Sequence, residues 1–212
     1  MYTLYYSPST ASLVVHWLLI ELGGPFELAL VDFSRKDQHS SAFLALNPNG
    51  HVPTLIVDGA PRAECAALLM LLAERHPQAN LLPAPGSPTR ADFLQVMFFL
   101  ANTLQPAFRR WFYSDEIAGP DNSQAVQKHA RAKIERCWEI LDARLADGRS
   151  YLIGEQLTVA DFLATMLARW SRNMPRMATH WPQLQHYVHR MRQMPSLRAV
   201  HVRESLKEWI DG

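Results

Sequence analysis

The residues from Asn47 to Pro53 could bind an extended peptide through their backbone. An Asn-Pro-Asn-Gly turn leads into Val52-Pro53, and the apolar residues 54–57 follow as a strand. Since proline cannot donate to a strand ladder, Pro53 is expected at or just before the start of that strand. A cis Val52-Pro53 bond would turn the N–H and C=O of Val52 outward, free to pair with a peptide ligand at a sheet edge. The alternative is a tight turn that binds nothing.

Hydroxyl groups cluster near the start of the chain. Ser9, Thr10 and Ser12 lie where the apolar helical pattern of residues 12–22 begins. Side chains of this kind cap the unpaired N–H groups of a helix N-terminus. Helix capping is therefore their first interpretation.

The elements that would position these residues alternate along the first 79 residues. The predicted strands are 3–7, 26–33, 52–57 and 61–63, and the predicted helices are 12–22, 40–46 and 64–75. Asp58-Gly59 predicts a hairpin turn. The order β-α-β-α-β-β-α indicates an α/β domain that begins with a right-handed βαβ unit.

Residues 80–88 contain three prolines and one glycine and are predicted to be a linker. The remainder, residues 89–212, reads as an all-α domain. Its predicted helices are 89–113, 123–147, 158–171, 181–194 and 196–210. Thr158 and Asp161 form a capping-box pattern, and the helix dipole favours the carboxylate at that position.

Composition excludes several classes of function. Lys and Arg total 21 against 20 Asp and Glu, a net charge of +1, so nothing indicates binding to nucleic acid. No apolar run reaches the roughly 18 residues of a membrane span, and no signal peptide is evident. Cys65 and Cys137 are expected as reduced thiols of a cytoplasmic protein, and no metal-binding spacing occurs.

Four motifs, in this order, resemble those of cytosolic glutathione transferases. They are Tyr5-Tyr6-Ser7-Pro8, the segment 47–53, Ala63-Glu64-Cys65 and the segment 157–161. The resemblance covers essentially the whole chain and is closest to the bacterial beta class. It implies a thioredoxin-like N-terminal domain (residues 1–79), a helical C-terminal domain (residues 89–212) and a homodimer.

The resemblance also implies how glutathione, the co-substrate, would be held. The backbone of Val52, exposed by Pro53, would pair with the cysteinyl part. Glu64 would bind the γ-glutamyl ammonium, and the Cys65 N–H its carboxylate. Two further side chains would meet the glycyl carboxylate, although each could equally be solvated surface. These are Lys36 and His51.

The catalytic position departs from the beta class. That class has a cysteine three residues after the early proline, where this chain has Ala11. Mixed-disulfide chemistry at this position is therefore not expected. Other branches of the family use a hydroxyl that donates to the glutathione sulfur and favours the thiolate. Ser9 is the first candidate and Ser12 the second; Thr10, Tyr5 and a backbone N–H remain alternatives.

A second departure lies in the first long helix of the C-terminal part. Phe98 and Gln105 stand near positions where beta-class members carry Asn and His, which puts a beta-type contact from the neighbouring subunit in doubt. The surrounding segment is strongly aromatic, and part of it must be core. Three of its residues are candidates for an apolar co-substrate pocket, namely Phe108, Trp111 and Tyr113.

The resemblance leads to a transferase that joins the glutathione thiolate to small hydrophobic electrophiles. Two alternatives remain. One is a non-catalytic binding module on the same scaffold, since fold does not fix function. The other is a glutathione-dependent reductase of disulfides or peroxides.

Overall fold

The computed structural model describes residues 1–210, which form two compact units. The first contains residues 1–82 together with residues 192–210, and the second contains residues 83–191. The boundary of these units differs from the predicted helical domain 89–212, because residues 192–210 fall in the first unit. Residues 211–212 of that prediction lie outside the described part of the chain.

A four-stranded mixed sheet forms the first unit's centre. Its strands are β1 (Tyr2–Tyr6), β2 (Phe26–Leu30), β3 (Thr54–Val57) and β4 (Ala60–Arg62), in the spatial order β2-β1-β3-β4. β1 pairs in parallel with β2 and antiparallel with β3, and β4 returns antiparallel to β3. The predicted α/β class and the predicted succession of strands along the chain are confirmed.

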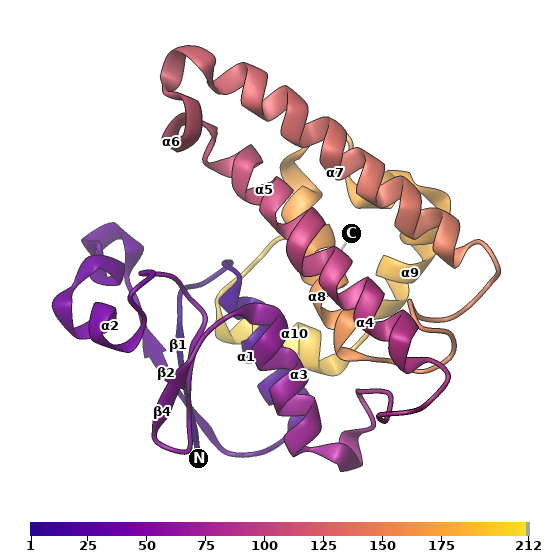
Figure 1. Ribbon diagram of the computed structural model, residues 1–212, viewed down its shortest axis with the longest axis horizontal. Coiled ribbons are helices and arrows are strands. Elements are labelled where there is room, and N and C mark those ends of the chain that lie inside the picture. Colours follow the sequence, from indigo (N-terminus) through magenta and orange to yellow (C-terminus); the bar gives the residue numbers. More distant parts are fainter. Residues whose placement is uncertain (211–212) are drawn as a thin grey trace. The chain divides into compact units, whose positions relative to one another are not determined.

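Four α-helices accompany the sheet. They are α1 (Ser12–Leu22), α2 (Ser41–Leu46), α3 (Cys65–Arg75) and α10 (Pro195–Arg203). α1 packs against both α3 and α10, as Figure 1 shows. Every residue of α1 from Ser12 to Leu19 is buried, as expected for a helix that is covered on several sides.

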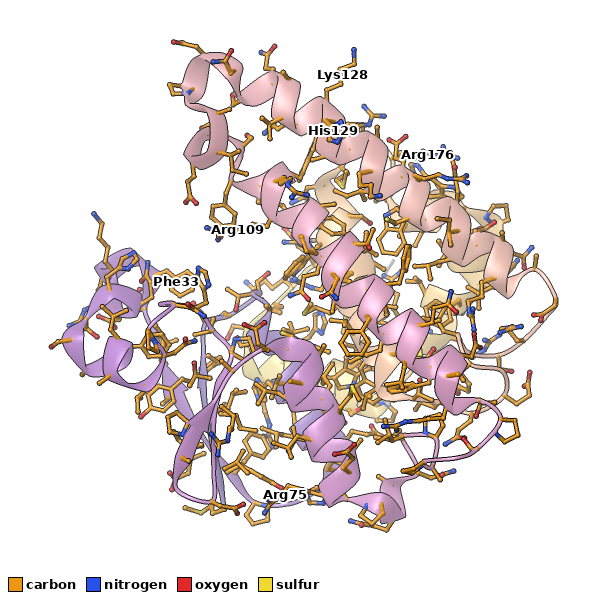
Figure 2. All side chains as sticks on the ribbon, viewed as in Figure 1. Phe33, Arg75, Arg109, Lys128, His129 and Arg176 are labelled. Atoms are coloured by element: carbon orange, nitrogen blue, oxygen red, sulfur yellow. The ribbon has the colours of Figure 1, made fainter. Side chains whose placement is uncertain are left out.

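The hairpin of β3 and β4 is tied to α3 at its turn. Asp58 stands at the turn with a positive φ of 52°. Arg75, at the end of α3, donates two hydrogen bonds of 2.6 and 2.8 Å to the Asp58 carboxylate. Figure 2 shows Arg75 at this end of the helix. The ion pair with Arg75 lowers the pKa of Asp58 below its ordinary value.

Some element boundaries differ from the predicted ones for local reasons. β2 ends at Leu30 because the Asp32 side chain accepts the Ser34 N–H and starts a short 3-10 turn, Phe33–Arg35. α10 ends at Arg203, seven residues before the predicted end. There Ser205 adopts a left-handed φ of 56°, and the N–H of residue 206 bonds back to the carbonyl of residue 201.

The second unit is helical. Its helices are α4 (Arg90–Phe99), α5 (Gln105–Phe112), α6 (Ser114–Ala118), α7 (Ser123–Leu145), α8 (Val159–Trp170) and α9 (Pro182–Arg192). The predicted helix 89–113 is interrupted by a π-helical turn, Leu100–Leu104. Pro106 explains the interruption, because it lacks the N–H that an α-helix would donate to the carbonyl of Asn102.

The predicted capping box at α8 is confirmed. The Asp161 carboxylate accepts the Thr158 N–H at 2.8 Å, the Leu152 N–H at 2.9 Å and the Tyr187 hydroxyl at 3.1 Å. Asp161 is completely buried, and burial raises its pKa to about 6 despite these donors. This one side chain therefore connects the start of α8 with the preceding loop and with α9.

Among residues 1–210, no helix has both the length and the apolar character needed to cross a lipid bilayer. Both cysteines are buried, and neither forms a disulfide among residues 1–210, which agrees with the expected reduced thiols. Burial raises the pKa of the Cys137 thiol.

Candidate active site

The loop between β1 and α1 uses two of its hydroxyls internally. Ser12 is fully buried; its hydroxyl donates to the Ser7 carbonyl at 3.0 Å and accepts the Ser7 N–H at 3.1 Å. The Thr10 hydroxyl donates to the same carbonyl at 2.7 Å and lies 2.9 Å from the Ser12 oxygen. These hydrogen bonds join the Ser12 and Thr10 hydroxyls to the Ser7 backbone within the loop. Because Ser12 is buried and its hydroxyl is bonded internally, its position does not support a direct contact with a ligand.

Ser9 is half-buried and adopts a left-handed φ of 64° in the same loop. Its N–H donates at 2.9 Å to the Glu204 carboxylate, which follows α10. The sequence interpretation missed Glu204, because a single glutamate 195 residues away from Ser9 carries no local signal.

The backbone N–H groups of this loop are not equivalent. Those of Ser9, Thr10 and Ser12 are donated to partners within the first unit. The N–H of Ala11, directly before α1, has no hydrogen-bond partner among residues 1–210. A donor at a helix N-terminus carries a partial positive charge, so this position can stabilise an anion.

The Val52-Pro53 bond is cis, as predicted. Val52 precedes β3, which is an inner strand of the sheet, so the Val52 backbone lies beyond the end of the ladder and not along a sheet edge, where the peptide was expected to pair. Neither the N–H nor the C=O of Val52 has a partner within the described chain. Its side chain is 7% exposed and belongs to a small apolar cluster with Val31, Phe43 and the half-buried Tyr5.

Asn47 and Gly50 build the turn that presents Val52. The Asn47 side-chain amide donates to the His51 carbonyl at 2.8 Å and to the Thr54 hydroxyl at 3.1 Å. Gly50 has a φ of 63°, and a Cβ there would come within 3.0 Å of the Gln38 carbonyl oxygen. Glycine is therefore required at this position for both backbone conformation and space.

The N-terminus of α3 meets that of α1. Glu64 immediately precedes α3, is exposed, and has a φ of 70°. Cys65, the first residue of α3, is buried, and its thiol donates to the Ala11 carbonyl at 3.2 Å. The structure thus brings together the early hydroxyl loop and the Glu64-Cys65 motif, which are more than 50 residues apart in the chain.

Lys36 and His51 are exposed in the same unit. Lys36 has a φ of 59° and lies between two short 3-10 turns, next to the one that begins at Phe33 (Figure 2). No contact within residues 1–210 assigns either side chain a partner, so their anion-binding role stays a prediction. Among residues 1–210, no group of His, Cys, Asp or Glu side chains could hold a metal ion.

The aromatic candidates of the second unit separate into core and surface. Phe108 is fully buried and packs with the rings of Phe112, Trp138 and Trp170, so it belongs to the core and is not available to a substrate. The physical reason is its position on the inner side of α5, which packs against α7.

Trp111 is half-buried, and Tyr113 is 40% exposed with the Arg109 guanidinium 4.0 Å from its ring centroid. Figure 2 shows Arg109 extending outward from α5. Phe98 is 51% exposed, and Gln105 is half-buried at the start of α5. These surface side chains, unlike Phe108, can contact a ligand.

Comparison with known proteins identifies the family. Residues 1–80 match the family model described as "Glutathione S-transferase, N-terminal domain", and residues 99–195 match "Glutathione S-transferase, C-terminal domain". Glutathione S-transferase GST-4.5 of Xanthomonas campestris pv. campestris is 32% identical over 169 residues, 79% of this chain and 81% of the relative. The chain belongs to the glutathione S-transferase family.

Solved structures agree with this assignment. A sphingomonad glutathione S-transferase complexed with glutathione is 32% identical and has a TM-score of 0.84, with 96% of this chain and 99% of that chain covered. The bacterial beta-class glutathione S-transferase of Sphingomonas chungbukensis is 28% identical, with a TM-score of 0.83 and coverage of 96% and 99%. The thioredoxin-like N-terminal domain and the resemblance to the beta class are therefore confirmed for this glutathione S-transferase.

Proposed function

We propose that this glutathione S-transferase binds glutathione on its first unit and joins the glutathione thiolate to small hydrophobic electrophiles. The observation that carries the proposal is the backbone of Val52, whose N–H and C=O both lack partners among residues 1–210, beside a buried side chain. An extended tripeptide can pair with both groups at once. The bound glutathione of the sphingomonad relative supports this ligand.

Other groups of the first unit would hold the ends of the tripeptide. Glu64 would bind the γ-glutamyl ammonium, and the Cys65 N–H at the start of α3 would bind the neighbouring carboxylate. Lys36 and His51 would meet the glycyl carboxylate as exposed donors. Tyr5 would contribute through the apolar cluster under Val52, rather than by its hydroxyl.

Ser9 is the proposed activator of the glutathione thiol. The hydroxyls of Thr10 and Ser12 are committed to the Ser7 backbone, and Ser9 directly follows Pro8 in the same half-buried loop. Its hydroxyl would donate to the sulfur and lower the pKa of the thiol from its usual value of about 8.5. The N–H of Ala11 and the N-terminus of α1 would add to this stabilisation. Because position 11 carries no thiol, the chemistry would proceed without a mixed disulfide at that residue.

The electrophile would bind against Trp111 and Tyr113, and the active assembly would be a homodimer. An exposed aromatic surface suits flat, apolar co-substrates such as activated aryl halides. Once the thiolate is formed, placing the two reactants in contact supplies much of the catalytic effect. The proposed role of the protein is thus thiolate stabilisation and positioning.

The test compares Ser9→Ala with Ser12→Ala. Loss of one donor to a charged sulfur costs about 1.5–3 kcal/mol, so Ser9→Ala should lower kcat roughly 10- to 100-fold and raise the pKa of bound glutathione. Ser12→Ala should reduce thermal stability but leave that pKa near the parent value. Turnover with aryl halides, epoxides, peroxides and disulfides, measured beside calorimetric glutathione binding, completes the test. Binding without any turnover would indicate a binding module, and turnover of disulfides or peroxides alone would indicate a reductase.

A further inference from the structure

Glu204 connects the C-terminal segment to the loop that carries Ser9. Its side chain is fully buried at the end of α10. One carboxylate oxygen accepts the Ser9 N–H at 2.9 Å, and the other lies 2.9 Å from Nδ1 of His16 on α1. A buried carboxylate is costly unless both oxygens are paired, and here each has a partner.

The contact acts on an unusual backbone conformation. Ser9 has a φ of 64°, which a residue with a Cβ adopts only when its surroundings enforce it. The Glu204 carboxylate bonds to the N–H of this same residue. The orientation of the Ser9 side chain therefore depends on where that carboxylate is held.

His16 holds the carboxylate in place. The imidazole is fully buried and packs edge-on against the rings of Tyr6 and Phe26, with centroid separations of 5.8 and 5.7 Å. Its second nitrogen, Nε2, is buried without a hydrogen-bond partner within the described chain. The buried His16 ring thus makes its polar contact with Glu204. We infer that this hydrogen bond orients the Glu204 carboxylate.

We propose that Glu204 is a positioning residue for catalysis: its carboxylate, oriented by His16, keeps Ser9 in the conformation that directs the Ser9 hydroxyl at the glutathione sulfur. This inference rests on the proposed function of Ser9. It adds a residue of the C-terminal segment that would act through Ser9 rather than on either substrate.

The experiment measures the pKa of glutathione bound to the full-length protein, from the ultraviolet absorbance of the thiolate, together with kcat. Glu204→Ala should raise that pKa by about one unit and lower kcat about tenfold, while the Kd for glutathione changes less than about threefold. Glu204→Gln should restore most of the loss, because its amide oxygen can still accept the Ser9 N–H. Glu21→Ala removes an exposed carboxylate from α1 and serves as the control with the same charge change.

Ser9→Ala and the double variant Ser9→Ala/Glu204→Ala separate the two proposals. If Glu204 acts through Ser9, the double variant should lose no more activity than Ser9→Ala alone. A Glu204→Ala protein that is less stable but keeps the parent thiol pKa and kcat would overturn the positioning role and leave Ser9 untouched. Additive losses in the double variant would overturn it as well. A normal thiol pKa in Ser9→Ala would instead overturn the proposed activation by Ser9, and the positioning role with it.

Discussion

At the scale of residues, the polar groups of the candidate site are of two kinds. Some have no hydrogen-bond partner among residues 1–210, and others are bonded to partners inside the fold. Val52 buries its side chain, and its backbone N–H and C=O have no partner in the described part of the chain; Ser12 buries a hydroxyl that both donates and accepts a hydrogen bond. The two residues were predicted with the same kind of evidence, a motif position. They differ in their hydrogen bonds: a polar group whose donors and acceptors are already bonded inside the fold is not available to bind a ligand.

Glu64→Gln tests the proposed contact with the γ-glutamyl ammonium. The substitution keeps the size of the side chain and removes its charge, so the hydrogen bond to the ammonium loses its ionic character. A contact of this type is worth about 1.5–3 kcal/mol, and the KM for glutathione should rise roughly 10- to 100-fold. The kcat should stay near the parent value, since the ammonium does not change during the reaction.

The control for Glu64→Gln is Glu21→Gln, another exposed glutamate, on α1. Titration calorimetry measures the affinity for glutathione, and steady-state kinetics measure KM and kcat. An unchanged glutathione affinity in Glu64→Gln would show that Glu64 does not bind the ammonium.

At the scale of elements, helix ends carry most of the polar organisation. The N-termini of α1 and α3 meet through Cys65 and Ala11, and α8 begins with the capping box of Thr158 and Asp161. Among these helix-end groups, Asp161 is the most sensitive to pH, because burial raises its pKa to about 6. Its titration therefore contributes to stability in a window that can be measured.

Asp161→Asn tests that contribution. In the folded state the pKa is about 6, above the ordinary 3.8, so the folded state binds the proton more tightly than the unfolded chain. The protonated Asp161 carboxyl therefore stabilises the folded state below about pH 4, and this contribution is lost as the pH rises to about 6. A rise of about two units corresponds to about 3 kcal/mol. The free energy of unfolding of the parent should fall by about this amount, relative to Asp161→Asn, between pH 4 and 7.

Urea unfolding at several pH values measures the difference between the two proteins. The remaining carboxylates titrate alike in both and cancel in this comparison. If the parent and Asp161→Asn curves run parallel across the window, Asp161 does not titrate there.

At the scale of the whole molecule, the chain leaves the first unit near residue 82 and comes back to it at residue 192. α10 then packs against α1, with Leu197 and Val200 buried. The first unit is thus completed by residues from the opposite end of the sequence. The last described helix therefore contributes to the stability of that unit, and Glu204, directly after it, bonds to the loop at Ser9.

Leu197→Ala should destabilise the first unit specifically. Removing a buried leucine side chain costs about 2–5 kcal/mol, because transfer energy is lost and a cavity remains. Hydrogen exchange should accelerate in β1 and α1 more than in α7, which belongs to the second unit. Val202→Ala on the same helix is the control, since Val202 is 79% exposed and should change stability by less than about 0.5 kcal/mol.

Equal acceleration of exchange in both units would contradict the assignment of α10 to the first unit. So would a Leu197→Ala protein with the stability of Val202→Ala.

The sequence by itself determined the order of the elements in the first unit, the cis bond at Pro53 and the capping box at Asp161. Each of these depends on residues within a few positions of one another, where proline geometry and side-chain caps act directly on the backbone. Only the tertiary structure decided that Ser12 faces inward, that Phe108 is core, and that Glu204 lies against Ser9 and His16. These facts depend on which surfaces pack together across the chain, and a buried hydrogen bond between residues 195 positions apart has no signature in local composition.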